Sequence, residues 1–118
     1  MPLAQARANV ALNPALTAER AEWLEADVFH ALRDFRKAGR DFDMIVLDPP
    51  KFAPSAAHAE RAAKAYRDIN ILGFRLLRPG GMMMTYSCSG GVGLEMFQKI
   101  VADSALDAGR QARIVRRL

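Results

Sequence analysis

A short apolar run closed by two prolines is the feature that most constrains how this chain can fold. Residues 44–47 are continuously apolar, and Pro49 and Pro50 follow after a single intervening residue, Asp48. A run of this length between breakers is typical of a strand buried on both faces of a parallel sheet. Because proline has no N–H group to give to a sheet ladder, we expect the strand to cover residues 43–48 and to stop there.

Hydrophobic periodicity and breakers predict helices and strands that alternate along the chain. The expected helices cover residues 3–12, 28–38, 66–77 and 94–108. The expected strands cover residues 21–26, 43–48, 82–87 and 111–115, with the three methionines of 82–84 buried. Residues 53–63 are rich in alanine without an apolar stripe, so we expect them to be poorly ordered, or helical only in their second half. The alternation predicts an α/β fold with a parallel sheet and flanking helices.

Size and composition limit the classes of protein that the chain can represent. Its 118 residues make one domain or a piece of one. The net charge of +4 allows an anionic partner without requiring one. The single cysteine excludes an internal disulfide and fits a reducing cytoplasm. We see no stretch of signal-peptide type and no run long enough to span a membrane, so no membrane partner is expected.

Several motifs occur in an order that resembles the bacterial RlmI family. They lie at residues 9–13, 27–29, 48–52, 66–70, 77–81, 87–90 and 97–100. An Asp-Pro-Pro motif occurs in several groups of nucleic-acid methyltransferases, whereas its combination with the single cysteine of Ser87-Cys88-Ser89 is much more specific. The resemblance implies a class I methyltransferase that uses S-adenosylmethionine to make 5-methylcytosine in large-subunit ribosomal RNA.

The same resemblance implies that residues 1–118 are part of a methyltransferase domain. Family members carry RNA-binding domains, a glycine-rich motif and two strands before the point where the similarity begins, and this chain has no glycine-rich loop after a first strand. The expected fold is therefore an incomplete Rossmann-like sheet that lacks its first two strands. An open sheet edge invites association, so we expect either residues 21–26 or a second copy, in a homodimer, to cover the edge of the 43–48 strand.

Cys88 and Asp48 are the candidate catalytic residues. A thiolate that adds to C6 of cytosine makes C5 nucleophilic, and cysteine reaches the thiolate form near neutral pH after a modest pKa shift. Most free cysteines, however, are small buried hydrophobes. Asp48 follows a strand, where it can serve as a turn cap or as a working group. The resemblance implies that Cys88 is the nucleophile and that Asp48 holds a proton at ring N3 or helps to remove the C5 proton.

The resemblance also implies binding roles for residues beside these two. Asp27 and Val28 would contact adenine of S-adenosylmethionine, with Asp48 and Pro49 also on the cofactor side, although Asp27 can equally cap the following helix. The remaining candidates would contact the RNA base or backbone, and they are Pro50, Lys51 and Phe52. A solvated role for Lys51 and a core-anchoring role for Phe52 stay open.

Other polar residues suggest weaker hypotheses. Four basic residues share one face of the expected 28–38 helix and its end, and they are Arg33, Arg36, Lys37 and Arg40. Such a face can follow an RNA backbone but is more often simply solvated. His30 and His58 have no metal-ligand spacing, so no metal is expected. Two alternative functions remain: methylation of another RNA base or of an exocyclic amine, and a non-catalytic, self-associating α/β remnant.

Overall fold

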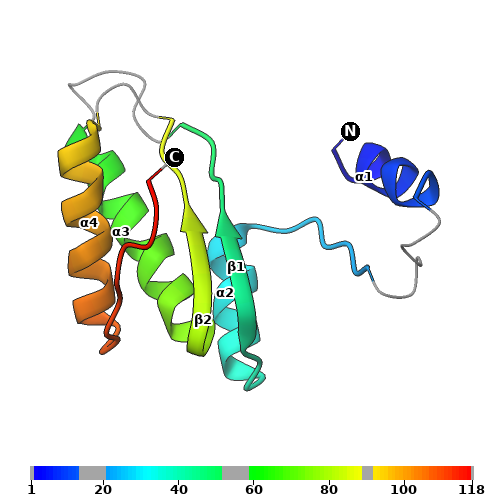
Figure 1. Cartoon of the computed structure of the whole chain (residues 1–118). Coiled ribbons are helices and arrows are strands. Elements are labelled where there is room, and N and C mark those ends of the chain that lie inside the picture. The colour runs from blue at the N-terminus through cyan, green and yellow to red at the C-terminus, as the bar shows by residue number, and fades with distance from the viewer. Residues whose placement is uncertain (1, 14–20, 52–58, 89–91, 118) are drawn as a thin grey trace.

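A computed structural model describes residues 2–13, 21–51, 59–88 and 92–117 of the chain. This part contains four helices and two strands, in the order α1 Pro2–Ala11, α2 Val28–Lys37, β1 Phe42–Leu47, α3 Ala59–Leu76, β2 Leu77–Thr85 and α4 Leu94–Asp107. The two strands form a parallel pair, so the fold is α/β as the alternating pattern predicts. Figure 1 shows α2, α3 and α4 on one side of this pair, with α1 apart from them.

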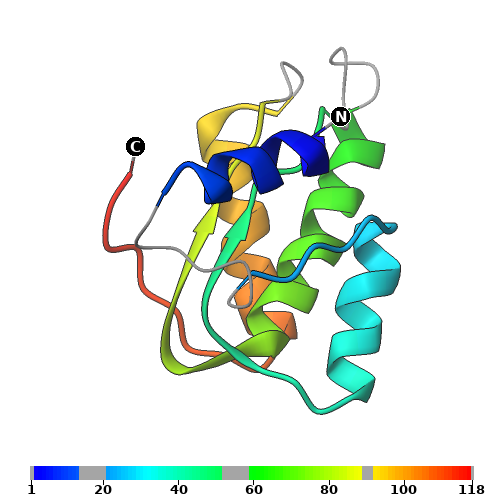
Figure 2. The ribbon, with the colours of Figure 1, turned by 90° about the vertical axis from the view of Figure 1, so that its right-hand side faces the viewer.

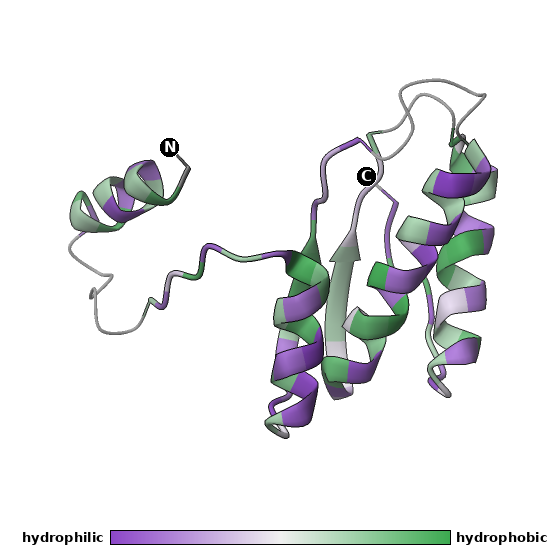
Figure 3. Ribbon diagram, turned by 180° about the vertical axis from the view of Figure 1, so that it is seen from behind, coloured by the Kyte–Doolittle hydropathy of each residue, from purple (hydrophilic) through white to green (hydrophobic). Residues whose placement is uncertain are grey.

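Helix α3 is the element on which the others pack. It contacts β1, β2, α2 and α4, whereas α1 packs against none of the described helices and strands. Figure 2 shows the two layers from the side, with the strands to the left of α3. Seen from behind in Figure 3, these helices carry hydrophobic and hydrophilic residues on different sides of their axes, which is typical of helices that cover a sheet.

The sequence of α3 accounts for this central position. Its fully buried side chains include Ala62, Tyr66 and Ile69, at four- and three-residue intervals, and Leu76 follows two turns later on the same face. The C-terminal part of that face packs with Leu32 of α2 and Leu47 of β1 in one hydrophobic cluster. The N-terminal part packs with residues of α4 in a second hydrophobic cluster. Helix α4 is also tied to α3 because the Arg67 guanidinium donates to the carboxylate of Asp107, at 2.9 Å.

The register of the two strands has an irregular start and a regular end. Phe42 pairs with Leu77, but Met44 pairs with Met82, so β2 has several more residues than β1 between these two pairs. Gly80 in that bulge has φ of 81°, a conformation that favours glycine. The regular ladder therefore begins at Met82, where the sequence predicts its strand to begin, and ends at Thr85 rather than at residue 87.

Two of the four expected strands are wrong. Residues 21–26 and 111–117 have no sheet ladder, although both were expected to hold strands, at 21–26 and 111–115. The physical reason is that a strand needs a neighbour, and in the described residues the sheet contains only β1 and β2. The alternative in which residues 21–26 cover the edge of β1 is thus not realised.

The remaining expectations for regular structure agree with the observed elements, within the described residues. The helices at 3–12, 28–38 and 94–108 correspond to α1, α2 and α4, each within one or two residues. Helix α3 begins at Ala59, ahead of the expected start at residue 66 and in line with helix in the second half of 53–63. The first half of that segment lies outside the described residues.

The expectation that β1 is buried on both faces, which rests on its apolar run, is also wrong. Leu47 is buried against the helices, but Met44 and Val46 on the other face are 52% and 56% exposed. Met82 on β2 is likewise 55% exposed, while Met83 packs against the core. The sheet face opposite the helices is therefore an open apolar surface, which we call the open face and define by Met44, Val46 and Met82.

We expect the 118-residue chain to self-associate through the open face, because removing clustered apolar side chains from water favours association. Sedimentation should show a species heavier than the 13.0 kDa monomer. Val46→Lys should shift the distribution toward monomer, since a charge on that face opposes burial. Leu106→Lys is the matched control, because Leu106 is 77% exposed but lies on α4. A wild-type chain that stays monomeric at all concentrations would contradict this expectation.

We expect Gly81→Ala to destabilise the fold by about 1–3 kcal/mol, the usual cost of overpacking. A Cβ at Gly81 would lie 2.8 Å from the carbonyl oxygens of Arg78 and Asp43, and backbone atoms cannot easily move away. Gly93→Ser is the control, because a Cβ there meets no atom within 4 Å and serine is a favoured N-cap residue. Urea unfolding measures the stability of both variants. Equal stability of Gly81→Ala and the wild type would contradict the close packing at the bulge.

Candidate active site

The carboxyl ends of β1 and β2 bring together two loops that are far apart in the sequence. Leu47 pairs with Thr85, and the Tyr86 N–H group donates to the carbonyl of Leu47 at 3.0 Å. Asp48 and Cys88 follow these positions on adjacent parallel strands, so both lie at the same sheet edge, as predicted. Parallel strands favour ligand binding at this edge.

Cys88 is an exposed thiol beside the proline loop. Its Sγ lies 3.9 Å from the carbonyl oxygen of Pro49, to which the thiol can donate a weak hydrogen bond. The ring of Pro49 is buried and fixes the loop, whereas Asp48, Pro50 and Lys51 are exposed. The arrangement therefore presents a thiol and a carboxylate to solvent from two neighbouring loops. The alternative reading of Cys88 as a small buried hydrophobe is wrong, because the residue is exposed.

Part of the predicted site lies outside the described residues. Phe52 and Ser89 are among these positions, so the proposed stacking role of Phe52 and the last residue of the Ser87-Cys88-Ser89 motif have no structural description here. His58 lies outside them as well. Within the described residues no group of three or more His, Cys, Asp or Glu side chains could hold a metal ion, and no helix is long and apolar enough to cross a membrane.

Asp27 caps α2 at the same end of the sheet. Its carboxylate accepts a hydrogen bond from the Phe29 N–H group at 3.2 Å, which satisfies one of the free donors at the start of the helix. Figure 1 shows that the first turn of α2 lies near the arrowheads of β1 and β2. Asp27 is exposed, and the adjoining Val28 is 40% exposed. An exposed carboxylate can accept a hydrogen bond from an amino group, and the adjoining apolar side chain can pack against a flat ring.

The four basic residues expected to share one helix face have separate surroundings. Arg40 lies over the rings of Phe35 and Phe42, at 4.8 and 5.2 Å, and within 4.0 Å of Glu22. Arg36 and Lys37 are exposed near the end of α2. Arg33 instead lines an open cleft toward α3. Arg40 is thus held by aromatic rings and Glu22, whereas Arg33, Arg36 and Lys37 remain exposed on α2.

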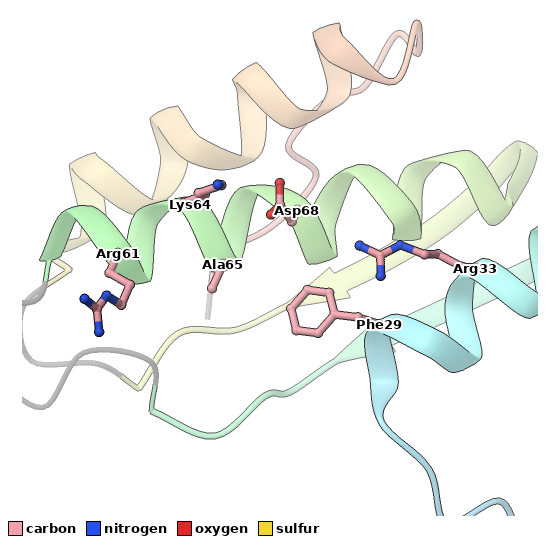
Figure 4. Close-up of a pocket in the computed structure, with 6 residues that line it drawn as sticks. All are labelled: Phe29, Arg33, Arg61, Lys64, Ala65 and Asp68. Carbon is pink, nitrogen blue, oxygen red and sulfur yellow. The ribbon is translucent and has the colours of Figure 1, made fainter.

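The cleft between α2 and α3 is the feature that sequence reasoning missed. It has a volume of about 430 Å³ and is lined by Phe29, Arg33, Arg61, Lys64, Ala65 and Asp68. Figure 4 shows Phe29 and Arg33 extending from α2 toward the residues of α3. The four α3 positions follow the i, i+3, i+4, i+7 spacing of one helix face, which could have been recognised in the sequence.

Two arginines have raised pKa values, and both support the scaffold. The pKa of Arg78 is raised by hydrogen bonds to Asp43 and then Asp41, and these residues lie by the bulge at the start of the sheet, opposite the candidate site. The pKa of Arg67 is raised chiefly by its hydrogen bond to Asp107, which joins α3 to the end of α4. Because arginine is charged at neutral pH in any case, these ion pairs add no titration in the physiological range.

Comparison with known proteins identifies close relatives over the whole chain. The chain is 50% identical over 118 residues to a protein of Shewanella amazonensis named "Ribosomal RNA large subunit methyltransferase I", and this match covers 100% of the chain but 30% of the relative. Proteins of the same name from Aeromonas salmonicida and Aeromonas hydrophila are 53% and 54% identical, over 96% and 93% of the chain and 28% of each relative. The chain thus spans about 30% of the length of these curated relatives. No family model matches the chain.

We expect Asp27→Ala to lower the free energy of unfolding by about 1 kcal/mol, the typical effect of losing an N-cap. Asp27→Ser should keep most of that stability, because a serine hydroxyl can accept the same hydrogen bond from the Phe29 N–H group. Urea unfolding of both variants checks this. If Asp27→Ala and Asp27→Ser were equally unstable, the carboxylate would have a structural role other than capping.

Proposed function

Because the chain belongs to the family named ribosomal RNA large subunit methyltransferase I, as a segment of about 30% of its relatives' length, we propose that it is the part of such an enzyme that methylates large-subunit ribosomal RNA. The observation that carries this proposal is 50% identity over all 118 residues. The exposed thiol at the carboxyl edge of a parallel strand pair supports it, since this is where α/β folds bind their ligands.

In this proposal residues 1–118 form a partial methyltransferase domain with an incomplete Rossmann-like sheet. The β1–β2 pair, joined through α3, would be two neighbouring strands of a larger sheet. The open face and the bare outer edges of both strands support this assignment, because a complete sheet of this class is covered on both faces. The cytoplasm, expected from the single cysteine, is the compartment that fits an enzyme of ribosomal RNA.

S-adenosylmethionine is the cofactor that the proposal requires, and it supplies an electrophilic methyl group when bound. Asp27 and Val28 would hold its adenine, with Asp48 and Pro49 on the strand side of the same edge. The exposed carboxylate of Asp27 keeps an oxygen free for the adenine amino group while the other accepts from the Phe29 N–H group. The chain has no glycine-rich loop after a first strand, so the methionine part would be held outside these residues.

The proposed chemistry starts at Cys88. Its thiolate forms a bond to C6 of an extruded cytosine, which turns C5 into an enamine-like nucleophile. C5 would then bond to the methyl group that bound S-adenosylmethionine supplies, with S-adenosylhomocysteine as the leaving group. Asp48 would hold a proton at ring N3 or take part in removing the C5 proton, after which the bond between sulfur and C6 would break and Cys88 would be regenerated. Pro50, Lys51 and Phe52 would contact the base and its phosphate. The fixed position of Pro49 beside the Cys88 sulfur supports placing these two loops on one substrate.

A second candidate is a non-catalytic, self-associating remnant. The specific observation in its favour is the lack of a glycine-rich loop after a first strand, together with the open face. Calorimetry with S-adenosylmethionine discriminates the two. Tight binding by these 118 residues would contradict the remnant hypothesis.

We expect Cys88→Ala, made in a complete protein that contains this segment, to lower the rate of cytosine C5 methylation by a factor on the order of 10³ or more. Without the thiolate, C5 has no route to become nucleophilic. Leu106→Ala is the control, because Leu106 is exposed on α4 away from the sheet edge. The measurement is methyl incorporation into ribosomal RNA with mapping of the modified atom. A wild-type rate for Cys88→Ala would exclude the thiolate mechanism and favour methylation of another base or of an exocyclic amine.

A further inference from the structure

The cleft between α2 and α3 is a charged concavity that the proposed chemistry does not use. Its three basic side chains, Arg33, Arg61 and Lys64, face a single acidic one, Asp68. Within the described residues none of the three basic side chains forms a salt bridge. Three exposed, unpaired cations around one concavity produce a positive field that attracts an anionic partner.

The other residues of the cleft narrow the class of anion. The ring of Phe29 forms part of the lining and gives a flat apolar surface on which a base can stack. The carboxylate of Asp68 would repel a simple inorganic anion, but it can accept a hydrogen bond from a hydroxyl or amino group. A partner that combines phosphates, flat bases and hydroxyl donors is a single-stranded RNA, and its 2′-hydroxyl is such a donor.

The position of the cleft connects it to the candidate active site. Phe29 lies two residues after Asp27, in the first turn of α2, and Arg61 lies in the first turn of α3, which follows the Asp48 loop. Figure 4 shows Arg61 beyond the arrowhead of β2, with Arg33 farther back along the strands. The cleft therefore starts near the carboxyl edge of the sheet and extends along the outer side of α2 and α3.

We infer that this cleft binds the phosphate backbone of a single-stranded RNA segment next to the target nucleotide, an inference that rests on the proposed function. Arg33, Arg61 and Lys64 contact phosphates, Phe29 stacks with a base, and Asp68 accepts from a 2′-hydroxyl. The RNA segment next to the target nucleotide is thereby held on the helix side of the domain, while the target base reaches the loops of Asp48 and Cys88.

The test is the binding of a fluorescein-labelled cytidine oligoribonucleotide to the 118-residue chain, measured by anisotropy from about 20 to about 200 mM salt. Arg33→Gln and Lys64→Gln should each weaken binding several-fold and reduce the slope of log K against log salt by about 0.7, the value for one lost phosphate contact on a single strand. Arg36→Gln and Arg75→Gln are matched controls on the same two helices, and they remove the same charge outside the cleft. Circular dichroism confirms that the exposed variants remain folded.

A second readout concerns Asp68. Asp68→Asn should reduce the preference for the ribo-oligonucleotide over the deoxyribo-oligonucleotide of the same sequence, because the hydrogen bond to a 2′-hydroxyl is weakened. General electrostatics predicts only tighter binding to both. If the ratio of ribo- to deoxyribo-oligonucleotide affinity did not change, Asp68 would make no contact with a 2′-hydroxyl. This result would overturn the RNA assignment.

Several results would overturn the inference. Equal losses in the cleft and control variants would mean that charge attracts RNA without a defined site, and no binding at the lowest salt would exclude the cleft altogether. Binding of polyglutamate with the same dependence on Arg33 and Lys64 would reassign the cleft to an acidic peptide. The proposed function fails separately, if a complete protein that contains this segment does not methylate ribosomal RNA while the cleft variants still lose RNA binding.

Discussion

The packing of α3 onto the strand pair is the interaction on which the rest of the structure depends. At Gly73 the helix comes so close to the sheet that a Cβ would lie 3.0 Å from both Leu47 Cδ1 and Met83 Sδ. This approach lets one buried helix face fill the space over both strands, with the fully buried Ile69 and Leu76 on either side of the contact. Because α2 and α4 pack on the flanks of α3, their positions follow from the same contact.

The candidate site follows from the direction of the two strands. Since β1 and β2 are parallel, their carboxyl ends meet at one edge, and the loops after them carry Asp48 and Cys88. The buried Pro49 fixes the first loop, and its carbonyl oxygen lies beside the sulfur of the second. A two-stranded pair is therefore enough to join residues forty positions apart in the sequence, and α2 adds Asp27 at the same end of the sheet.

The open face and the cleft between α2 and α3 differ in whether they need a partner to cover them. The open face is apolar and has no cover in the described residues, so it needs another polypeptide, whether a second copy or further sheet of a larger domain. The match to only 30% of the length of the relatives is consistent with the latter. The cleft between α2 and α3 is charged instead, and its cations are stable in water without a partner. Association on the open face would leave the cleft free, because the two lie on opposite sides of the strand pair.

Local sequence determined those elements whose signals are carried within their own residues. The capping carboxylate and breakers bound α2, the three- and four-residue repeat of apolar side chains sets the buried face of α3, and Pro49 and Pro50 end β1. The order of strand and loop likewise placed Asp48 and Cys88 at one edge. Tertiary structure alone decided what depends on a neighbour. Residues 21–26 and 111–117 form no ladder because no described strand lies beside them. Val46 is exposed because no described segment covers the second face, and the cleft exists only because α2 lies against α3.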